Sequence, residues 1–535
     1  MHSTTSFRAS APPADAARGC HIGRPRDFYA PRAPWAPGPL GVERSIEPER
    51  SAIGARLLRA AIALTGLLVF AGCATRPVNP PLAVADPDTG YRFETRPVAI
   101  KDRDTLIVLA FSGGGTRAAA FSYGVLEALR DTDIAAPDGK ASKLLDDVSV
   151  ITGVSGGSFT ALAYGLYGNK LFDQYEQRFL KRNVEGELLR RLFSPAYWGP
   201  LSSTGWGRSE LAADYYDEIL FDGATYADLQ RGAGPLVVAA ATDLSSGARF
   251  YFSQVMFDIM CSDLSGMRLA RAAAASSAVP VVLSPVTINN YGGTCGYRPP
   301  AWLPKVAQVQ KQERAAARIM QEVTDLEAYR DGKERPYIHL VDGGVADNLA
   351  LRGVMNVMDE MEAARFVDEP MPLGSVKRIA VIVVNSVSIP TTAWDRFVDA
   401  PGVFEILMQA TGVPIDHYSY EAIDQLRDTA SRWKIYRAVR DSGAIIDAGN
   451  PALRAVERGP DAEIYVIDVS FDQLKDAAER DYLNQLPTSF VLSAEAVDRL
   501  RAAAKTVLAG SDEFNQLLHD MGGRAAGSAV TGSPQ

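Results

Sequence analysis

Residues 148–163 read Val-Ser-Val-Ile-Thr-Gly-Val-Ser-Gly-Gly-Ser-Phe-Thr-Ala-Leu-Ala, and this stretch decides the fold. The apolar run at 148–152 predicts a buried strand, and the run that starts at Phe159 predicts a helix. Between them stands Gly153-Val154-Ser155-Gly156-Gly157. A sharp strand-to-helix turn with room at Gly153 and Gly157 predicts that the Ser155 hydroxyl projects from the sheet as a nucleophile. A glycine-rich turn with a helix-capping serine is the alternative for this pattern taken alone.

Apolar runs of strand length alternate with helical patterns on both sides of this motif. Their near-continuous Val, Ile and Leu content is typical of strands that are covered on both faces. The alternation predicts an α/β fold with a largely parallel central sheet flanked by helices. The expected strands are Thr105–Phe111, Val148–Thr152, Leu236–Ala241, Ile338–Val341, Ile379–Val384 and Ile464–Val469.

A second glycine-rich turn ends the first of these strands, in Ser112-Gly113-Gly114-Gly115-Thr116-Arg117-Ala118. Three glycines at a strand-to-helix turn expose successive backbone N–H groups, which can bind negative charge that develops on a carbonyl oxygen. We therefore predict an oxyanion hole at Gly113, Gly114 and Gly115. Arg117 is interpreted either as added positive charge there, able to bind a phosphate headgroup, or as a structural residue.

Nucleotide binding is the competing interpretation of this turn. No Gly-Lys-Ser/Thr follows the glycines, and the dinucleotide pattern fits only in a variant form that ends on Ala118. The acidic residue of a dinucleotide site is expected at a strand end, whereas Asp131 and Asp133 stand at the end of the predicted first helix. The oxyanion hole is the preferred interpretation.

A nucleophilic serine requires a base, and Asp342 is the candidate. In Tyr337-Ile-His-Leu-Val-Asp-Gly343-Gly344 the aspartate closes a predicted buried strand, which places its carboxylate at the sheet edge where Ser155 emerges. His339 has the opposite parity on that strand and is interpreted as a packed core residue rather than a relay. A turn-capping aspartate is the alternative for the Asp-Gly-Gly motif alone.

Three motifs in this order resemble the signatures of patatin-like phospholipases: Gly113-Gly114-Gly115-Thr116-Arg117, Gly153-Val154-Ser155-Gly156-Gly157 and Asp342-Gly343-Gly344. Two further segments, 239–244 and 274–280, are also similar to that family. The resemblance covers roughly residues 102 to 387 and implies a three-layer α/β/α fold. Ala118 is a departure, because many members have glycine there.

The resemblance also implies an activity: calcium-independent hydrolysis of carboxylic esters by a Ser155–Asp342 dyad without histidine. In that scheme Ser155 attacks the acyl carbonyl, Asp342 accepts the proton, and the amides near Gly114 and Gly115 hold the oxyanion. The implied substrate is a phospholipid or another acyl-ester lipid at a membrane surface. Two alternatives stay open: a Ser–His–Asp esterase that uses His417, and a catalytically degenerate lipid-binding surface lipoprotein.

An export signal is predicted ahead of this region. Arg56 and Arg59 precede the apolar run Ala60–Ala74, which is short for a bilayer span but has the pattern of a secretory signal. Its ending, Phe70-Ala71-Gly72-Cys73, resembles a bacterial lipobox and implies lipidation of Cys73. Because Ala74 is not aspartate, the resemblance implies the outer membrane. A plain signal peptide or a short anchor with an incidental cysteine is the alternative.

The remaining cysteines and the net charge limit the other functions that the chain can have. Cys20 is expected to be lost with the leader, which leaves Cys261 and Cys295 as a pair in an oxidising compartment, either disulfide-bonded or as two free thiols. A net charge of −9 gives no basic footprint for nucleic acid, and no His/Cys cluster has zinc-site spacing. We therefore expect no nucleic-acid partner, no metal and no cofactor; the sequence makes no prediction about oligomeric state.

Composition divides the chain into five expected parts. These are a leader and signal at 1–73, a linker at 74–103, the catalytic domain at 104–390, a C-terminal region at 391–521 that completes or caps it, and a disordered tail at 522–535. Between Pro304 and Arg335 the spacing predicts one amphipathic helix, interpreted as a surface helix or as a lid over a lipid site. The segment after Ser493 predicts a helix capped by that serine.

Overall fold

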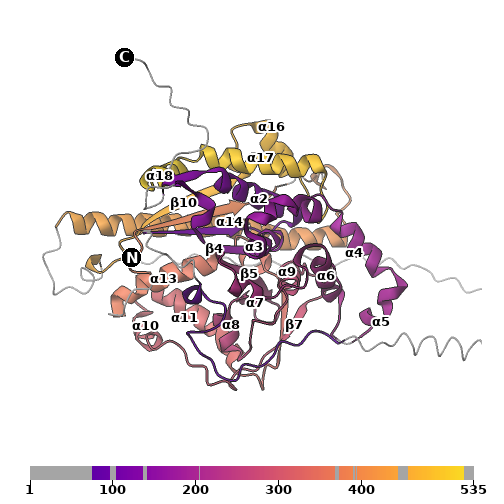
Figure 1. The fold of residues 1–535 in the computed structure, drawn as a ribbon, viewed down its shortest axis with the longest axis horizontal. Helices are drawn as coiled ribbons and strands as arrows, with labels where there is room; N and C mark the ends of the chain where they lie inside the picture. The colour runs from indigo at the N-terminus through magenta and orange to yellow at the C-terminus, as the bar shows by residue number, and fades with distance from the viewer. Residues whose placement is uncertain are drawn as a thin grey trace, which may run out of the picture. The chain divides into compact units, whose positions relative to one another are not determined.

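A mixed eight-stranded sheet organises the chain (Figure 1), with strands in the order β10-β9-β1-β4-β5-β8-β7 and with β6 paired to β5. The computed structural model describes residues 75–96, 104–135, 141–203, 205–367, 373–389, 392, 394–443 and 456–522. All of them lie in the unit Gly66–Gln535. The predicted leader, Cys73 and the tail after 522 lie outside the described residues.

Five strands of the sheet run parallel, and each of them was predicted from an apolar run. They are β1 (Thr105–Phe111), β4 (Val148–Val154), β5 (Leu236–Asp243), β9 (Arg378–Asn385) and β10 (Glu463–Ser470). β1 lies at the centre between β4 and β9, and all seven of its residues are buried. The largely parallel α/β fold is therefore confirmed.

The sixth predicted strand, β8 (Tyr337–Asp342), runs antiparallel to β5. Asp342 pairs with Ala241 near the C-terminal end of β5, so it reaches the expected sheet edge from the opposite direction. The prediction that Asp342 lies at this sheet edge was right. The assumption behind it, that its strand runs parallel to the others, was wrong, because an apolar run does not encode strand direction. Two short antiparallel strands, β6 (Arg249–Tyr251) and β7 (Val286–Asn289), were not predicted.

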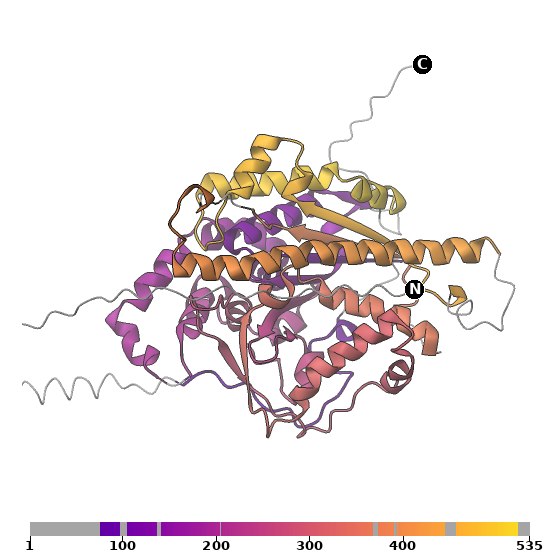
Figure 2. The same ribbon diagram turned by 180° about the vertical axis from the view of Figure 1, so that it is seen from behind.

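Helices cover both faces of the sheet and complete three layers. Alternate residues of β1 enter different cores: Ile107, Leu109 and Phe111 on one face, and Leu106, Val108 and Ala110 on the other. The first core contains α2 (Gly115–Asp131), α3 (Gly156–Tyr167) and α17 (Ala494–Gly510), and the second contains α13 (Arg352–Val367) and α14 (Val403–Asp441). Figure 2 shows α14 crossing the sheet on the side away from α17.

The segment after Pro304 forms two helices, not one. α10 (Leu303–Val309) and α11 (Arg314–Glu327) are separated by a break at 310–313. α11 packs its apolar residues Ala315, Ala316 and Ile319 next to α13, and Arg318 pairs with Asp359 of that helix. This packing matches the interpretation as a surface helix.

The C-terminal region adds β10 to the sheet and α17 to one helical layer. Ser493 caps α17, because its hydroxyl accepts the Ala496 N–H at 3.1 Å, as predicted. Within the described ranges, no helix has both the length and the apolar character needed to cross a bilayer. The other described elements are β2 (Asp133–Ala135), β3 (Ala141–Lys143), α4 (Val184–Leu192), α5 (Trp198–Leu201), α6 (Arg208–Tyr216), α7 (Tyr226–Arg231), α8 (Gln254–Ile259), α9 (Leu269–Ser276), α12 (Gly344–Asp347), α16 (Ala477–Asn484) and α18 (Asp512–Asp520).

An N-terminal strap, defined as residues 75–85, runs along the protein surface ahead of β1. Its Leu82 N–H donates to the Cys261 carbonyl at 2.7 Å, and its Ala85 N–H donates to the Cys295 carbonyl at 3.1 Å. Cys261 and Cys295 form a disulfide with a Cα–Cα distance of 5.3 Å. The disulfide thus joins the two positions that hold this part of the strap.

Candidate active site

Ser155 occupies the turn between β4 and α3 in a strained backbone conformation, with φ 48° and ψ −122°. The turn is tightly packed: a Cβ on Gly156 would lie 1.9 Å from the Gly115 carbonyl oxygen, and one on Gly157 would lie 2.6 Å from the Ser112 carbonyl oxygen. Glycine is therefore required at both positions. The predicted elbow is present, and the Ser155 residue is only 5% exposed.

Ser276, at the end of α9, holds this strained turn. The Ser155 backbone N–H donates to the Ser276 hydroxyl at 2.9 Å, and that hydroxyl donates to the Ala240 carbonyl at 2.6 Å. The Ser276 carbonyl in turn accepts the Gly343 N–H at 3.1 Å. The sequence reasoning assigned no role to Ser276; its only signal was the family-like segment 274–280.

Asp342 lies beside Ser155 as a buried carboxylate. Burial raises the pKa of Asp342 to about 6, while hydrogen bonds from the Gly344 N–H and from the Ser155 hydroxyl act to lower it. The Gly344 N–H reaches Oδ1 of Asp342 at 2.8 Å, and the Asp342 N–H donates to the Ala278 carbonyl at 3.0 Å. The structure thus brings together the two residues that the sequence paired.

The glycine-rich loop after β1 faces the same point. The Gly113 N–H donates to the Asn348 carbonyl at 2.9 Å, so the prediction of Gly113 as an oxyanion donor was wrong. Among the described residues, the N–H groups of Gly114 and Gly115 donate to no protein acceptor. Gly114 has φ 136° and Gly115 has φ 61°, which favour glycine. Of the three predicted N–H groups, those of Gly114 and Gly115 therefore have no acceptor in the described part of the protein.

Arg117 forms hydrogen bonds to three acceptors outside this loop. Its guanidinium donates to the Ser386 carbonyl at 2.8 Å, to the Leu486 carbonyl at 2.8 Å and to the Thr488 hydroxyl at 3.0 Å. The residue is buried, and these acceptors occupy its guanidinium. Of the two interpretations from sequence, the structural one is correct, and the assignment of Arg117 to the oxyanion hole was wrong.

Asn348 connects the glycine-rich loop to the Asp-Gly-Gly motif and was not identified from the sequence. A Cβ on Gly113 would lie 2.4 Å from Oδ1 of Asn348, and a Cβ on Gly344 would lie 2.9 Å from the same atom. Both glycines therefore make room for this amide. A pocket of about 230 Å³ opens beside it, lined by residues of α12 and α14 that include Val345 and Tyr418.

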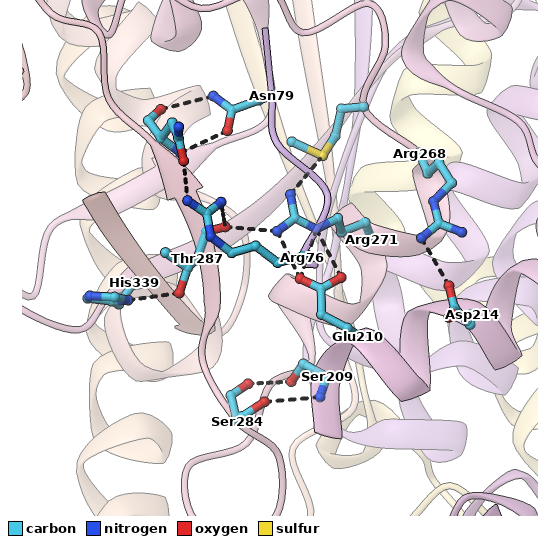
Figure 3. Close-up of polar contacts among 12 residues, drawn as sticks. Arg76, Asn79, Ser209, Glu210, Asp214, Arg268, Arg271, Ser284, Thr287 and His339 are labelled. Carbon is cyan, nitrogen blue, oxygen red and sulfur yellow. Dashed lines mark hydrogen bonds and ion pairs between the residues drawn. The ribbon is translucent and has the colours of Figure 1, made fainter. Parts of the chain in front are cut away.

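His339 and His417 form no hydrogen bond or ion pair with Ser155 or Asp342 in the described part of the chain. His339 is exposed and its Nδ1 lies 2.9 Å from the Thr287 hydroxyl (Figure 3), so its prediction as a packed core residue was wrong. His417 lies on α14 with an exposed side chain, and no interaction in the described part of the chain joins it to Ser155 or Asp342. The same residues contain no group of three or more His, Cys, Asp or Glu side chains placed to hold a metal ion.

One family model and several solved structures are similar to this chain. Residues 109–355 match the model of the family described as patatin-like phospholipase. A comparison with curated protein sequences gives no match. Human GIVD cytosolic phospholipase A2 is similar in structure, with a TM-score of 0.35 and 15% identity, over 78% of this chain and 60% of that one. VipD from Legionella pneumophila is similar with a TM-score of 0.23 and 12% identity, over 83% and 74% of the two chains.

This chain therefore spans about 60% of the length of the human phospholipase that it matches. The family match begins within β1 and ends within α13, so it includes the glycine-rich loop, the Ser155 elbow and Asp342. Residues 109–355 are thus similar to the patatin-like phospholipase family.

Proposed function

We propose that this chain hydrolyses carboxylic ester bonds of membrane phospholipids, with Ser155 as nucleophile and Asp342 as its base. The observation that carries the proposal is the placement of the Ser155 hydroxyl, in a strained turn, against a buried carboxylate whose pKa is raised to about 6. A carboxylate with such a pKa is ionised near neutral pH and is a stronger base than an exposed aspartate.

The reaction needs only these groups and water. Ser155 Oγ attacks the acyl carbon and its proton passes to Asp342, while the carbonyl oxygen becomes an oxyanion. The N–H groups of Gly114 and Gly115 are the proposed donors to that oxygen, and such donors contribute a few kcal/mol each to transition-state stabilisation. Asp342 then protonates the leaving alcohol, and water, with Asp342 again as base, hydrolyses the acyl-enzyme.

A fluorophosphonate probe tests the nucleophile. The full-length protein is expected to gain one covalent adduct by mass, mapped to the peptide that contains Ser155. Ser155→Ala is expected to abolish the adduct, whereas Ser277→Ala, whose hydroxyl bonds to the Ala273 carbonyl and not to Ser155, is expected to retain it. Failure of the wild-type protein to react would favour the alternative of a lipid-binding protein without turnover.

The same proposal includes a location. Cys73 is the proposed lipid anchor of an exported, outer-membrane protein, and it precedes the first described residue, Thr75, by two positions. The tether would hold the dyad next to its substrate. Radiolabelled palmitate incorporated by the producing bacterium is expected in the wild-type protein and absent from Cys73→Ala; label that survives the substitution would contradict the anchor.

A further inference from the structure

Five large apolar side chains are exposed on two neighbouring segments of the structure. Leu189 and Phe193 lie four residues apart on one face of α4 and its C-cap, and are 49% and 73% exposed. Trp198, the first residue of α5, is 59% exposed, and Val281 and Val282, in the loop after α9, are 54% and 49% exposed. A cluster of exposed apolar side chains that includes aromatic residues is typical of an interaction surface.

Each segment is linked through hydrogen bonds to one part of the proposed reaction centre. In the first turn of α4, Glu185 accepts a hydrogen bond from the Ser489 hydroxyl at 2.7 Å. The Ser489 carbonyl accepts the Thr116 N–H at 2.9 Å, next to the glycine-rich loop. The loop that carries Val281 follows Ala278, whose carbonyl holds the Asp342 N–H. Hydrogen bonds therefore link the two segments to the glycine-rich loop and to Asp342, respectively.

The two segments also meet each other. After α5 the chain turns into α6, and at its start the Ser209 N–H donates to the Ser284 hydroxyl at 3.1 Å. The Ser209 hydroxyl donates to the Ser284 carbonyl, as Figure 3 shows. This pair joins the α5 side of the surface to the loop of Val281 and Val282.

The N-terminal strap starts at this same place. Arg76 donates to the Thr287 carbonyl at 3.2 Å and to the Asn289 side chain (Figure 3). A Cβ on Gly205, which lies between α5 and α6, would be 3.1 Å from Cδ of Arg76. In both Figure 1 and Figure 2 the strap begins beside α5.

The chain that precedes the strap is apolar. The run Ala60–Ala74 lies outside the described residues and ends one residue before Thr75. Two residues of extended chain span about 7 Å, so Cys73 lies within that distance of the strap's first residue. A bilayer that held a lipid on Cys73 would therefore lie near the start of the strap, which begins beside α5.

We propose that Leu189, Phe193, Trp198, Val281 and Val282 form a membrane-docking surface, which inserts into the interface of a phospholipid bilayer and turns the Ser155–Asp342 centre toward it. The inference rests on the proposed function, because it gives the substrate as lipid in a bilayer rather than as a soluble ester. The position of the strap favours a bilayer over a protein partner. Phe and Trp side chains gain free energy at such an interface by burying their rings.

The test uses the full-length chain with Cys73→Ala, so that no acyl anchor contributes, in a triple variant F193D/W198D/V282D. The probe is equimolar vesicles of dioleoyl-phosphatidylethanolamine and dioleoyl-phosphatidylglycerol. Vesicle binding, measured by sedimentation, and hydrolysis of vesicle lipid are expected to fall about tenfold or more. Turnover of soluble p-nitrophenyl butyrate is expected to stay unchanged, which also reports that the variant is folded.

The matched control is Ile435→Asp on α14, whose side chain is 59% exposed and lies in the C-terminal part of that helix. It is expected to leave binding and both activities unchanged. Equal loss in this control, or vesicle binding by the triple variant at the wild-type level, would overturn the docking surface. If the wild-type protein hydrolyses neither substrate, the proposed function fails while the sedimentation result still decides the docking surface.

A second readout does not depend on charged variants. Tryptophan fluorescence of the Cys73→Ala protein is expected to shift to shorter wavelength when vesicles are added, because Trp198 leaves water. Trp198→Phe is expected to remove most of that shift and to keep vesicle binding, since phenylalanine is also apolar. A shift that persists fully in Trp198→Phe would contradict insertion at α5.

Discussion

The backbone N–H of Ser155 donates to the hydroxyl of Ser276 at 2.9 Å, and through this bond one residue links both members of the proposed dyad. Ser276 also holds the Gly343 N–H with its carbonyl, directly after Asp342. A backbone with φ 48° at a non-glycine residue costs about 1–3 kcal/mol and persists only where its neighbours fix it. Ser276 thus holds the backbone of the proposed nucleophile in position.

Removing that hydroxyl is expected to slow turnover. In Ser276→Ala the Ser155 N–H and the Ala240 carbonyl lose their partner, and we expect kcat to fall about 10–100-fold with KM nearly unchanged. The position of the acid limb of the pH profile is expected to stay the same, because Asp342 keeps its surroundings. Steady-state kinetics on a soluble ester give all three values.

Ser277→Ala is the matched control for this change. Ser277 is equally buried, but its hydroxyl donates to the Ala273 carbonyl at 2.8 Å within its own helix and not to Ser155. We expect kcat within about threefold of wild type. An equal loss of kcat in both variants would show that Ser276 serves packing rather than positioning.

Activity is expected to depend on the ionisation of Asp342. Its pKa is about 6, so log kcat/KM should fall as the pH drops below 6, with a slope of about one per pH unit, because the protonated acid cannot accept the Ser155 proton. His417→Ala is expected to leave this profile unchanged. A profile whose midpoint moves with His417→Ala would favour the Ser–His–Asp alternative.

The same buried carboxylate is expected to reduce the stability of the fold. Because burial raises the pKa of Asp342 from 3.8 to about 6, the folded state binds the proton more tightly than the unfolded state does. The contribution of Asp342 to the free energy of unfolding is therefore present at low pH. It is lost as the pH rises through about 4 to 6, by up to about 3 kcal/mol.

Asp342→Asn is expected to remove this loss. The amide oxygen can still accept the Gly344 N–H, so the variant should be inactive and yet unfold at higher denaturant concentration than wild type at pH 8. At the acid end of the range, near pH 4, the two proteins should differ less. A variant that is less stable than wild type at pH 8 would show that the ionised carboxylate stabilises the fold.

Gly115→Ala tests the proposed oxyanion loop. Gly115 has φ 61°, and a Cβ there would lie 2.4 Å from the Ser489 carbonyl oxygen, so the loop must shift and carry its N–H groups away. We expect kcat to fall about 100-fold or more. Gly223→Ala is the control, since Gly223 has φ 81° with no atom within 4 Å of its added Cβ, and it should lose stability but not kcat.

The sequence predicted the strands because buried strands read as continuous apolar runs, and it located Ser155 because the elbow is a local pattern. It could not give the direction of β8, which depends on pairing with β5 across about a hundred residues of chain. Asn348 and Leu486 are even more remote in sequence from the glycine-rich loop. The sequence therefore did not predict that Gly113 donates to Asn348 or that Arg117 donates to Leu486.

The position of His339 on the strand correctly predicted that its side chain points away from Asp342. The prediction that this side chain is packed in the core was wrong. β8 and β7 lie at the end of the sheet, where one face of the strand is open, and His339 points there toward Thr287. The apolar neighbours of His339 in the sequence made the strand read as buried on both faces. Position within the sheet, rather than the local pattern, decides which residues are covered.

Product analysis on a mixed phospholipid extract tests the central claim most directly. Mass spectrometry is expected to show lysophospholipid and free fatty acid with the wild-type protein and with His417→Ala, and neither product above background with Ser155→Ala or Asp342→Asn. Products that persist in Ser155→Ala, or that disappear in His417→Ala while the protein stays folded, would contradict a Ser155–Asp342 dyad.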